Sequence, residues 1–274
     1  FRRALVLKWY VRLIRMPPAV YLLDFTTYRH KVAGGTGDKG HPATHERFMD
    51  ESRLARHPDG SVCFTADSIA FQEKIIATSS ISDNTVFPHS ILPRKLGEHG
   101  AKAETCALNM ENARLEAAEM MLSTVADLLE KTGVAPDRIG IVIVNCSLFC
   151  PTPSLSAMLV NHFQMRADVL TYNLGGMGCS ASPIAVDLAR RILSGPEQRN
   201  TLALVVSTEN ITQNWYRGNE RSMLLSNCLF RCGASAMLLS NRALDRWRAR
   251  FKLLHVVRTH MGMSDDCYRS VYQE

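Results

Sequence analysis

Two almost wholly apolar runs place the strongest restriction on how this chain folds. They cover Ile139–Asn145 (Ile-Gly-Ile-Val-Ile-Val-Asn) and residues 202–207 (Leu-Ala-Leu-Val-Val-Ser). A continuous apolar run is typical of a strand buried on both faces, whereas a half-exposed strand alternates apolar with polar residues. Helices must therefore cover both sides of the sheet that contains these runs. A chain of 274 residues is long enough to provide them.

The segments around these runs supply the rest of a layered α/β domain. The patterns predict further strands at residues 20–25, 169–174, 234–240 and 252–260, and helices at residues 67–78, 104–131 and 155–165 and after Cys179. Asp67 and Ser154 can cap two of these helices, and Gly133 ends another. This alternation favours a sheet with a helical layer on each face. Residues 30–62 are rich in Gly, Pro and charge, which predicts a flexible surface connection.

A glycine-rich turn delivers one cysteine to the start of a helix. Residues 173–181 read Asn-Leu-Gly-Gly-Met-Gly-Cys-Ser-Ala and follow a predicted strand. At a helix N-terminus the unpaired backbone N–H groups and the macrodipole favour negative charge, so the thiol of Cys179 would be a better nucleophile there. The glycines allow the backbone to turn sharply beside the sulfur. On this pattern alone, a small buried cysteine is the alternative interpretation.

Composition argues against several other classes of protein. The net charge of +6 is mild and the basic residues are mostly scattered, so nucleic-acid binding is not indicated. The eight cysteines form no Cys-x-x-Cys pair and follow no secretory signal. We therefore expect reduced thiols and no metal site.

Residues 1–17 form a basic segment in which Arg2, Arg3, Lys8 and other cations interrupt apolar residues. Such a segment is typical of a chain that lies on a membrane surface, and an ordinary amphipathic surface helix explains it equally well. No apolar run reaches the length of about 18 residues that a spanning helix needs, so the sequence predicts none.

Three blocks of sequence resemble one enzyme family. They are the turn at residues 173–181, Asn-Cys-Ser-Leu-Phe at 145–149, and Val-Ser-Thr-Glu-Asn-Ile-Thr-Gln-Asn-Trp-Tyr at 206–216. Together they resemble the plant-type 3-ketoacyl-CoA synthases, the membrane-bound condensing enzymes of very-long-chain fatty acid elongation. The resemblance extends with gaps from about Pro18 to Glu274. It implies the N-terminal half of a thiolase-like fold, with only the start of the C-terminal half.

The resemblance also implies a domain organisation. Residues 1–17 would be a juxtamembrane segment, and residues 18–241 the N-terminal thiolase-like condensing domain, with the flexible connection at 30–62 inside it. Residues 242–274 would begin a truncated C-terminal half. Two transmembrane helices precede this point in the family, so the resemblance implies a missing N-terminal anchor. It further implies an endoplasmic reticulum membrane location, with the catalytic part facing the cytosol.

The chemistry that the resemblance implies is acyl transfer followed by condensation. Cys179 would take the acyl group of a long-chain acyl-CoA as a thioester, and decarboxylated malonyl-CoA would attack it to give 3-oxoacyl-CoA, CO2 and CoA. Gly178 and Ser180 flank the nucleophile and are predicted to contact the substrate, because N–H groups at a helix start can stabilise the oxyanion. The CoA thioesters are substrates, and no cofactor is expected.

Further candidates are weaker. In the family a His and an Asn of the C-terminal half assist the reaction, and that block would follow Glu274. His260 matches a family histidine and is the candidate for assistance within the chain, although it could equally be a structural histidine at a strand end. Tyr216 lies where related type III polyketide synthases carry an aromatic residue near the acyl tunnel, which suggests acyl contact. His162 is interpreted as a packing residue.

Two alternatives to an elongation enzyme stay open. One is a catalytically incomplete chain that pairs with a full-length synthase, because thiolase-fold enzymes form homodimers through this half. The other is a soluble type III polyketide synthase-like or acyl-carrier-protein condensing enzyme, against which the basic N-terminal segment and residues 210–216 argue. Other elongase subunits are also possible partners.

The sequence departs from the family's usual residues at Ser182 and at residues 232–235. These departures are expected to change the packing of the acyl tunnel.

Overall fold

A computed structural model describes residues 18–29, 41–42, 44–88, 90–91 and 108–270 of the chain. The basic segment predicted at residues 1–17 lies outside the described residues. No helix in the described ranges is both long and apolar enough to cross a membrane.

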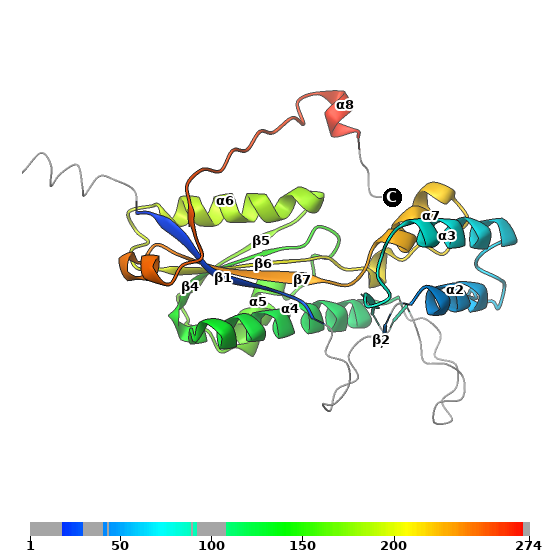
Figure 1. Cartoon of the computed structure of the whole chain (residues 1–274), viewed down its shortest axis with the longest axis horizontal. Helices are drawn as coiled ribbons and strands as arrows, with labels where there is room; N and C mark the ends of the chain where they lie inside the picture. Colours follow the sequence, from blue (N-terminus) through cyan, green and yellow to red (C-terminus); the bar gives the residue numbers. More distant parts are fainter. Residues whose placement is uncertain (1–17, 30–40, 43, 89, 92–107, 271–274) are drawn as a thin grey trace, which may run out of the picture.

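A six-stranded mixed sheet forms the centre of the fold, with the strand order β5-β4-β6-β7-β1-β8 (Figure 1). Its strands are β1 (Val20–Thr27), β4 (Ile139–Asn145), β5 (Leu170–Leu174), β6 (Leu202–Thr208), β7 (Ala234–Ser240) and β8 (Phe251–Leu253). β4 pairs in parallel with both β5 and β6, whereas β7, β1 and β8 add antiparallel pairs. A parallel pair needs a crossover connection, which the helices between these strands provide.

Helices cover both faces of the sheet, as the apolar runs predicted (Figure 1). The helices are α4 (Met110–Thr132) and α5 (Leu155–His162) on one face and α6 (Ala181–Leu193) on the other. The side chains of β4 alternate between the two layers: Val142 and Val144 belong to the core under α4 and α5, while Ile141 and Ile143 belong to the core under α6. The layered α/β prediction is therefore confirmed.

The ends of the helices agree with the predictions in part. Gly133 ends α4 in the left-handed conformation, with φ of 64°, and the side chain of Ser154 caps α5 as expected. α4 begins at Met110, later than predicted, because the side chain of Asn109 accepts a hydrogen bond from Asn112 N and caps it there. The cap of α3 is Thr65, not Asp67.

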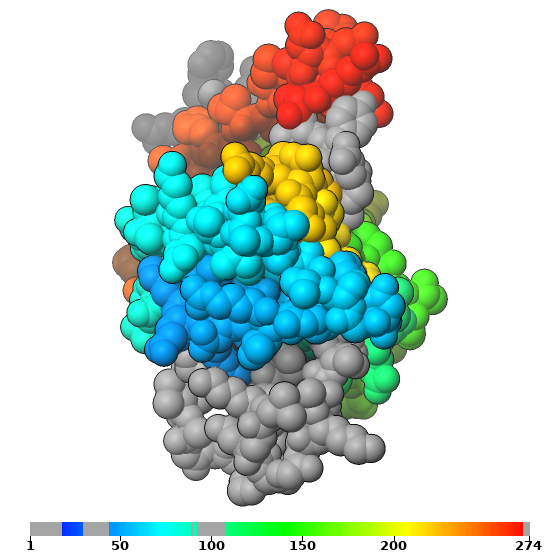
Figure 2. Space-filling view, turned by 90° about the vertical axis from the view of Figure 1, so that its right-hand side faces the viewer, coloured from blue at the N-terminus to red at the C-terminus, as the bar shows by residue number. Residues whose placement is uncertain are grey.

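A small helical lobe lies beside one end of the sheet, and the sequence analysis did not foresee most of it. It contains α2 (His45–Leu54), α3 (Ala66–Thr78), α7 (Arg221–Leu229) and the short strands β2 (His41–Pro42) and β3 (Val86–Phe87). Figure 2 looks onto this lobe, with α2 and α3 in blue to cyan and α7 in yellow. Phe48, Phe87 and Trp215 form an aromatic cluster in its core, with ring centroids 5.4 to 6.1 Å apart.

This lobe corrects the sequence analysis in two places. The flexible connection expected at residues 30–62 contains helix α2, and helix α7 lies between β6 and β7, where the sequence analysis predicts no helix. α2 buries Phe48 and Met49 but is otherwise mostly charged, so its apolar face is too narrow to give a clear helical period. Tertiary contacts with α3 decide that this segment is helical.

The last predicted strand is shorter than expected. β8 covers Phe251–Leu253 instead of residues 252–260, because it pairs only with the first three residues of β1. Pro18 precedes that part of β1 and has no N–H group to extend the pairing. Residues 254–264 are irregular, and a short helix, α8 (Asp265–Tyr268), follows them.

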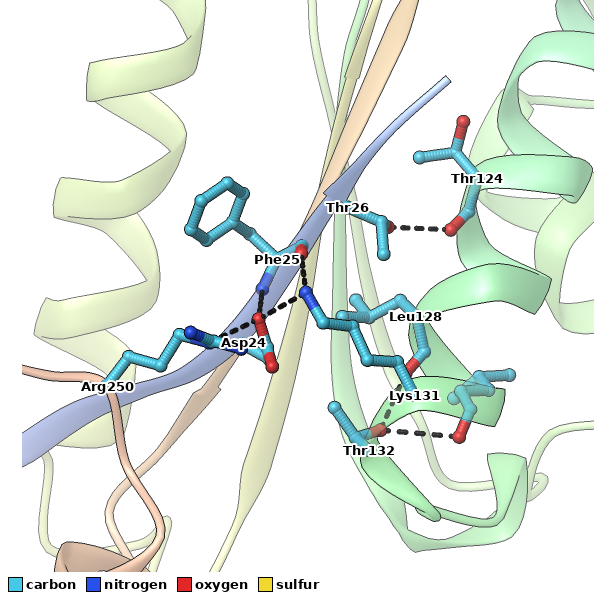
Figure 3. Close-up of polar contacts among 9 residues, drawn as sticks. Asp24, Phe25, Thr26, Thr124, Leu128, Lys131, Thr132 and Arg250 are labelled. Atoms are coloured by element: carbon cyan, nitrogen blue, oxygen red, sulfur yellow. Dashed lines mark hydrogen bonds and ion pairs between the residues drawn. The ribbon is translucent and has the colours of Figure 1, made fainter. Parts of the chain in front are cut away.

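An ion cluster joins the edge of the sheet to α4 (Figure 3). Lys131 Nζ lies 2.8 Å from Asp24 Oδ1, and Arg250 Nε lies 2.7 Å from the same oxygen. Burial acts to raise the pKa of Asp24, but hydrogen bonds from Lys131 and Arg250 outweigh it, so the pKa lies below its usual value. The carboxylate thus ties together β1, α4 and the segment before β8.

We expect Asp24→Asn to lower the free energy of unfolding by about 1 kcal/mol at pH 7, a small value because both cations are partly exposed. Since the pKa of Asp24 is lower in the folded than in the unfolded chain, its contribution is present above about pH 4 and is lost as the pH falls further. Urea unfolding of both proteins across this range measures the difference. Glu73→Gln, at an exposed carboxylate on α3, is the control. A difference independent of pH would contradict the assignment.

Candidate active site

Cys179 lies where β5 passes into α6, as the sequence predicts. It is the middle residue of a single 3-10 turn, η2 (Gly178–Ser180), that leads directly into α6, and it is exposed. Gly176 and Gly178 have φ of +69° and +56°, a region that side chains disfavour, so the turn needs glycine at both positions. No side chain caps α6, which leaves the N–H groups of its first turn without a side-chain acceptor.

The parallel strands bring two other loops to the same edge of the sheet. β4, β5 and β6 run in one direction, so their carboxyl ends, at Asn145, Leu174 and Thr208, meet at that edge. Asn145 is buried and its Nδ2 donates to Ser207 Oγ at 2.8 Å. Its Oδ1 accepts from Ser182 Oγ at 3.4 Å. The first turn of α6 is thus connected to the ends of two strands.

The carboxylate of Glu209 fixes the loop that follows β4. Glu209 comes directly after β6, and its oxygens accept hydrogen bonds from Ser147 N at 3.0 Å and Leu148 N at 2.8 Å. They also accept from Cys146 Sγ at 3.0 Å and Asn210 N at 3.2 Å. One side chain therefore satisfies four donors that would otherwise lack partners at the end of the sheet.

The loop held by Glu209 in turn contacts the turn that carries Cys179. Cys146 N donates to Leu174 O at 3.1 Å, and Met177 N donates to Ser147 Oγ at 3.3 Å. A Cβ atom on Gly175 would lie 3.0 Å from Cys150 Sγ, so the two loops approach as closely as a glycine permits. Glu209 is connected in this way to the backbone that carries Cys179.

A second carboxylate, Glu116 on α4, binds the backbone of residues 211 and 212, which follow Glu209 and Asn210 in the chain. It is buried, and its oxygens accept from Ile211 N at 2.8 Å and Thr212 N at 2.9 Å. Burial raises the pKa of Glu116, although the hydrogen bonds from Thr212 and Ile211 act in the opposite direction. Cys232 is one of the residues that differ from the family's usual sequence, and its Sγ donates to the same carboxylate at 3.6 Å.

The environments of the cysteines separate Cys179 from the buried thiols. Burial, followed by the hydrogen bond to Glu209, raises the pKa of Cys146, and burial and Glu116 raise that of Cys232. Burial also raises the pKa of Cys228 to about 11. These thiols stay protonated near neutral pH, whereas Cys179 and Cys150 are exposed. No group of three or more metal-ligating side chains occurs among the residues that the structure describes.

The other predicted site residues lie in different places. Ser180 is beside Cys179, and its Oγ donates to Met177 O at 2.7 Å. Tyr216 packs against Cys63, Phe64 and Leu224 in the helical lobe, and its hydroxyl oxygen accepts from Glu220 N at 3.2 Å.

The two histidines singled out from the sequence are both exposed. The Nδ1 atom of His260 accepts from Gly262 N at 3.2 Å, within the irregular segment after β8. The ring of His162 packs edge-on against Phe163 at the end of α5, with centroids 4.8 Å apart.

Sequence reasoning missed Glu209, Ser147 and Glu116 as residues that shape the site. A signal existed for Glu209: it is a charged residue directly after an apolar run, at the strand end where ligands bind in open α/β sheets. Glu116 gave none, since it occupies an ordinary helical position and its burial depends on the loop that α4 packs against.

Comparison with known proteins agrees with this arrangement. Residues 12–274 match the family model described as "FAE1/Type III polyketide synthase-like protein". The chain is 49% identical over 257 residues to 3-ketoacyl-CoA synthase 2 of Arabidopsis thaliana, covering 94% of this chain and 44% of that protein. It is 46% identical over 268 residues to 3-ketoacyl-CoA synthase 4 of the same plant, covering 96% and 46%. The chain thus spans about half the length of these curated relatives.

Solved structures show the fold. Germicidin synthase from Streptomyces coelicolor, a type III polyketide synthase, superposes with a TM-score of 0.58 at 16% identity, covering 87% of this chain and 63% of that one. Tetrahydroxynaphthalene synthase, also from Streptomyces coelicolor, gives 0.59 at 18% identity, covering 81% and 57%. The fold is therefore thiolase-like, as expected. From the family model and the relatives together, the chain belongs to the FAE1/type III polyketide synthase-like family and resembles its 3-ketoacyl-CoA synthases.

Proposed function

We propose that this chain carries the acyl-accepting part of a very-long-chain 3-oxoacyl-CoA synthase. The observation that carries the proposal is the position of Cys179, an exposed thiol on a glycine turn at the uncapped start of α6. An exposed thiol in this position is accessible to a thioester substrate. The names of the relatives point to the same reaction.

The reaction proceeds in two steps that share this sulfur. First, the Cys179 thiolate attacks the carbonyl carbon of a long-chain acyl-CoA; a carbon–sulfur bond to the enzyme forms, and the bond to CoA breaks and releases CoA thiolate. Second, malonyl-CoA loses CO2, and the electron pair left on its carbon attacks the enzyme thioester. A carbon–carbon bond forms, 3-oxoacyl-CoA leaves, and the Cys179 thiolate is regenerated. Both substrates are CoA thioesters, and the proposal includes no cofactor or metal.

Both steps place negative charge on a carbonyl oxygen. The N–H groups of the η2 turn and of the first turn of α6, around Gly178 and Ser180, are the donors that we propose for this oxyanion. Loss of one such donor commonly lowers the rate by about 100-fold or more. The hydrogen bonds from Glu209 through Ser147 to Met177 hold the backbone of this turn in place.

Other parts of the proposal rest on the family alone. The proton acceptor and enolate stabiliser would be a His and an Asn from the half of the relatives that this chain does not cover. We keep His260 as a candidate for assistance and Tyr216 as a candidate for acyl contact. The proposed location is the endoplasmic reticulum membrane with the site facing the cytosol, and other elongase subunits are proposed partners.

Pairing between chains is a second proposed function. β5 is at one edge of the described sheet and pairs only with β4 there, so one row of its backbone groups can pair with another strand. We propose that two copies associate through this edge as a homodimer. Such pairing would also allow this chain to associate with a full-length synthase.

Cys179→Ser should abolish acyl transfer to this chain. When the purified protein is incubated with a long-chain acyl-CoA, we expect the wild type to gain the mass of one acyl group on the peptide that contains Cys179. Cys150→Ser removes a second exposed thiol, the nearest control that the described residues offer, and should still be labelled. Label that persists in Cys179→Ser would show that another residue is the acceptor. A folded wild type that takes no label would contradict acyl transfer by this chain and favour the pairing role.

Glu209→Gln tests the residue that holds the loop after β4. The amide keeps the size of the side chain but offers one acceptor oxygen to four donors, so we expect the free energy of unfolding to fall by about 1 to 3 kcal/mol. Acylation of Cys179 should also slow at a temperature where the variant is folded. Glu197→Gln, an exposed change, is the control for both denaturant unfolding and acylation. Unchanged acylation in Glu209→Gln would restrict Glu209 to a structural role.

A further inference from the structure

A basic and aromatic turn projects from the sheet between β7 and β8. Residues 242–252, here called the basic turn, read Arg-Ala-Leu-Asp-Arg-Trp-Arg-Ala-Arg-Phe-Lys, with five cations and a single acidic residue, Asp245. Residues 243–247 of this turn form the 3-10 helix η4 (Ala243–Trp247). Neither the proposed reaction nor the core of the fold accounts for this concentration of charge.

Large apolar side chains of the basic turn are exposed. Leu244 is 83% exposed, Trp247 78% and Phe251 63%. The guanidinium of Arg246 stacks over the Trp247 ring at 4.2 Å, so a cation accompanies the exposed aromatic. Single exposed apolar residues are common, but three large ones within eight positions are a concentration that suits a binding surface.

Specific bonds hold the basic turn in this shape. The buried Asp245 accepts from Ser240 Oγ at 2.6 Å and pairs with Arg248 at 2.9 Å. Arg250 N donates to Leu22 O at 3.0 Å, and its side chain joins Asp24 in the ion cluster of Figure 3. Arg248 and Arg250 therefore anchor the turn, while Arg246 and Lys252 have no ion pair within the described residues and are exposed.

The basic turn lies at the end of the strands opposite to the end that carries Cys179. It follows Ser240, which pairs with Leu202 at the start of β6, whereas Glu209 follows the end of β6. The two ends of the sheet are separated by the length of β6, whose seven residues span about 23 Å. In Figure 1 the turn is the orange segment at the far left, and the helical lobe is at the right. Val20, where β1 begins, pairs with Leu253 beside the turn.

We propose that the basic turn is a docking surface for an anionic lipid bilayer. Protein segments that lie at a membrane–water interface typically combine Trp and Leu with Arg and Lys. The apolar side chains enter the lipid, and the cations stay at the headgroups. A second copy of this chain is a poor occupant of this surface, because a two-fold contact would place the five cations of one basic turn against the same five of the other. With the turn on the bilayer, the Cys179 edge faces away from it. This inference is independent of the acyl-transfer proposal.

Vesicle co-sedimentation of the whole chain tests this surface. The probes are vesicles of phosphatidylcholine alone and vesicles in which phosphatidylserine replaces about a quarter of it. We expect the wild type to bind the anionic vesicles, and about 1 M salt to release it because screening is then nearly complete. The double variants Leu244→Ser with Trp247→Ser, and Arg246→Gln with Lys252→Gln, should each lower the partition coefficient about tenfold or more.

Matched controls lie on the helical lobe, at the far end of the molecule. Leu54→Ser with Val62→Ser removes apolar side chains that are 66% and 58% exposed, and Lys74→Gln with Arg221→Gln removes two exposed cations. Both pairs should bind vesicles like the wild type. Thermal unfolding confirms that each variant is folded, and none of them changes the anchoring residues Asp245, Arg248 or Arg250.

Several results would overturn the proposal. Absence of wild-type binding to anionic vesicles would do so, as would equal binding to neutral ones. If both turn variants bound like the wild type, a different part of the chain would be the membrane contact. If the turn variants changed the sedimentation of the protein alone, by dissociating an oligomer, the turn would be a protein interface instead. Labelling of Cys179 by acyl-CoA in solution is a separate readout, which the turn variants should leave unchanged.

Discussion

The burial of β4 and β6 on both faces is the constraint on which the rest of this fold depends. β5 lies on one side of β4 and β6 on the other, so the chain moves in opposite directions across the sheet in its two crossovers. Right-handed crossovers in opposite directions place their helices on opposite faces, which is where α5 and α6 lie. The carboxyl ends of three strands then meet at one end of the sheet, and the turn that carries Cys179 is one of the loops that leave it.

Loops that leave a buried edge carry backbone N–H groups that need acceptors, and carboxylates meet this need here. Glu209 serves the loop after β4, and Glu116 serves the residues after Asn210. A carboxylate that accepts several N–H bonds fixes a loop more firmly than water would, because each bond is charge-assisted and shielded from solvent. Burial, assisted by the same carboxylates, raises the pKa of the Cys146 and Cys232 thiols. The thiol of Cys179, on the neighbouring turn, is exposed instead.

The two ends of the sheet differ in character. At the carboxyl ends of the parallel strands are glycine turns, the carboxylates of Glu209 and Glu116, and the helical lobe, which carries Tyr216 and Trp215. At the opposite end are the basic turn and the start of β1, joined through Asp24. In the two proposals above, the strands separate a surface for lipid headgroups from a site for CoA thioesters. The ion cluster would then fix the orientation of one relative to the other.

The sequence by itself determined the layered sheet and the position of Cys179. Long apolar strands and a glycine turn are local signals whose meaning does not depend on distant residues. The structure alone decided that α2 is a helix, because Phe48 and Met49 gain their burial only from α3 and the aromatic cluster. It also decided the roles of Glu209 and Glu116, whose partners lie 61 to 63 and 95 to 96 residues away in the chain. A carboxylate acquires such partners only when the strands and helices that carry them are packed together.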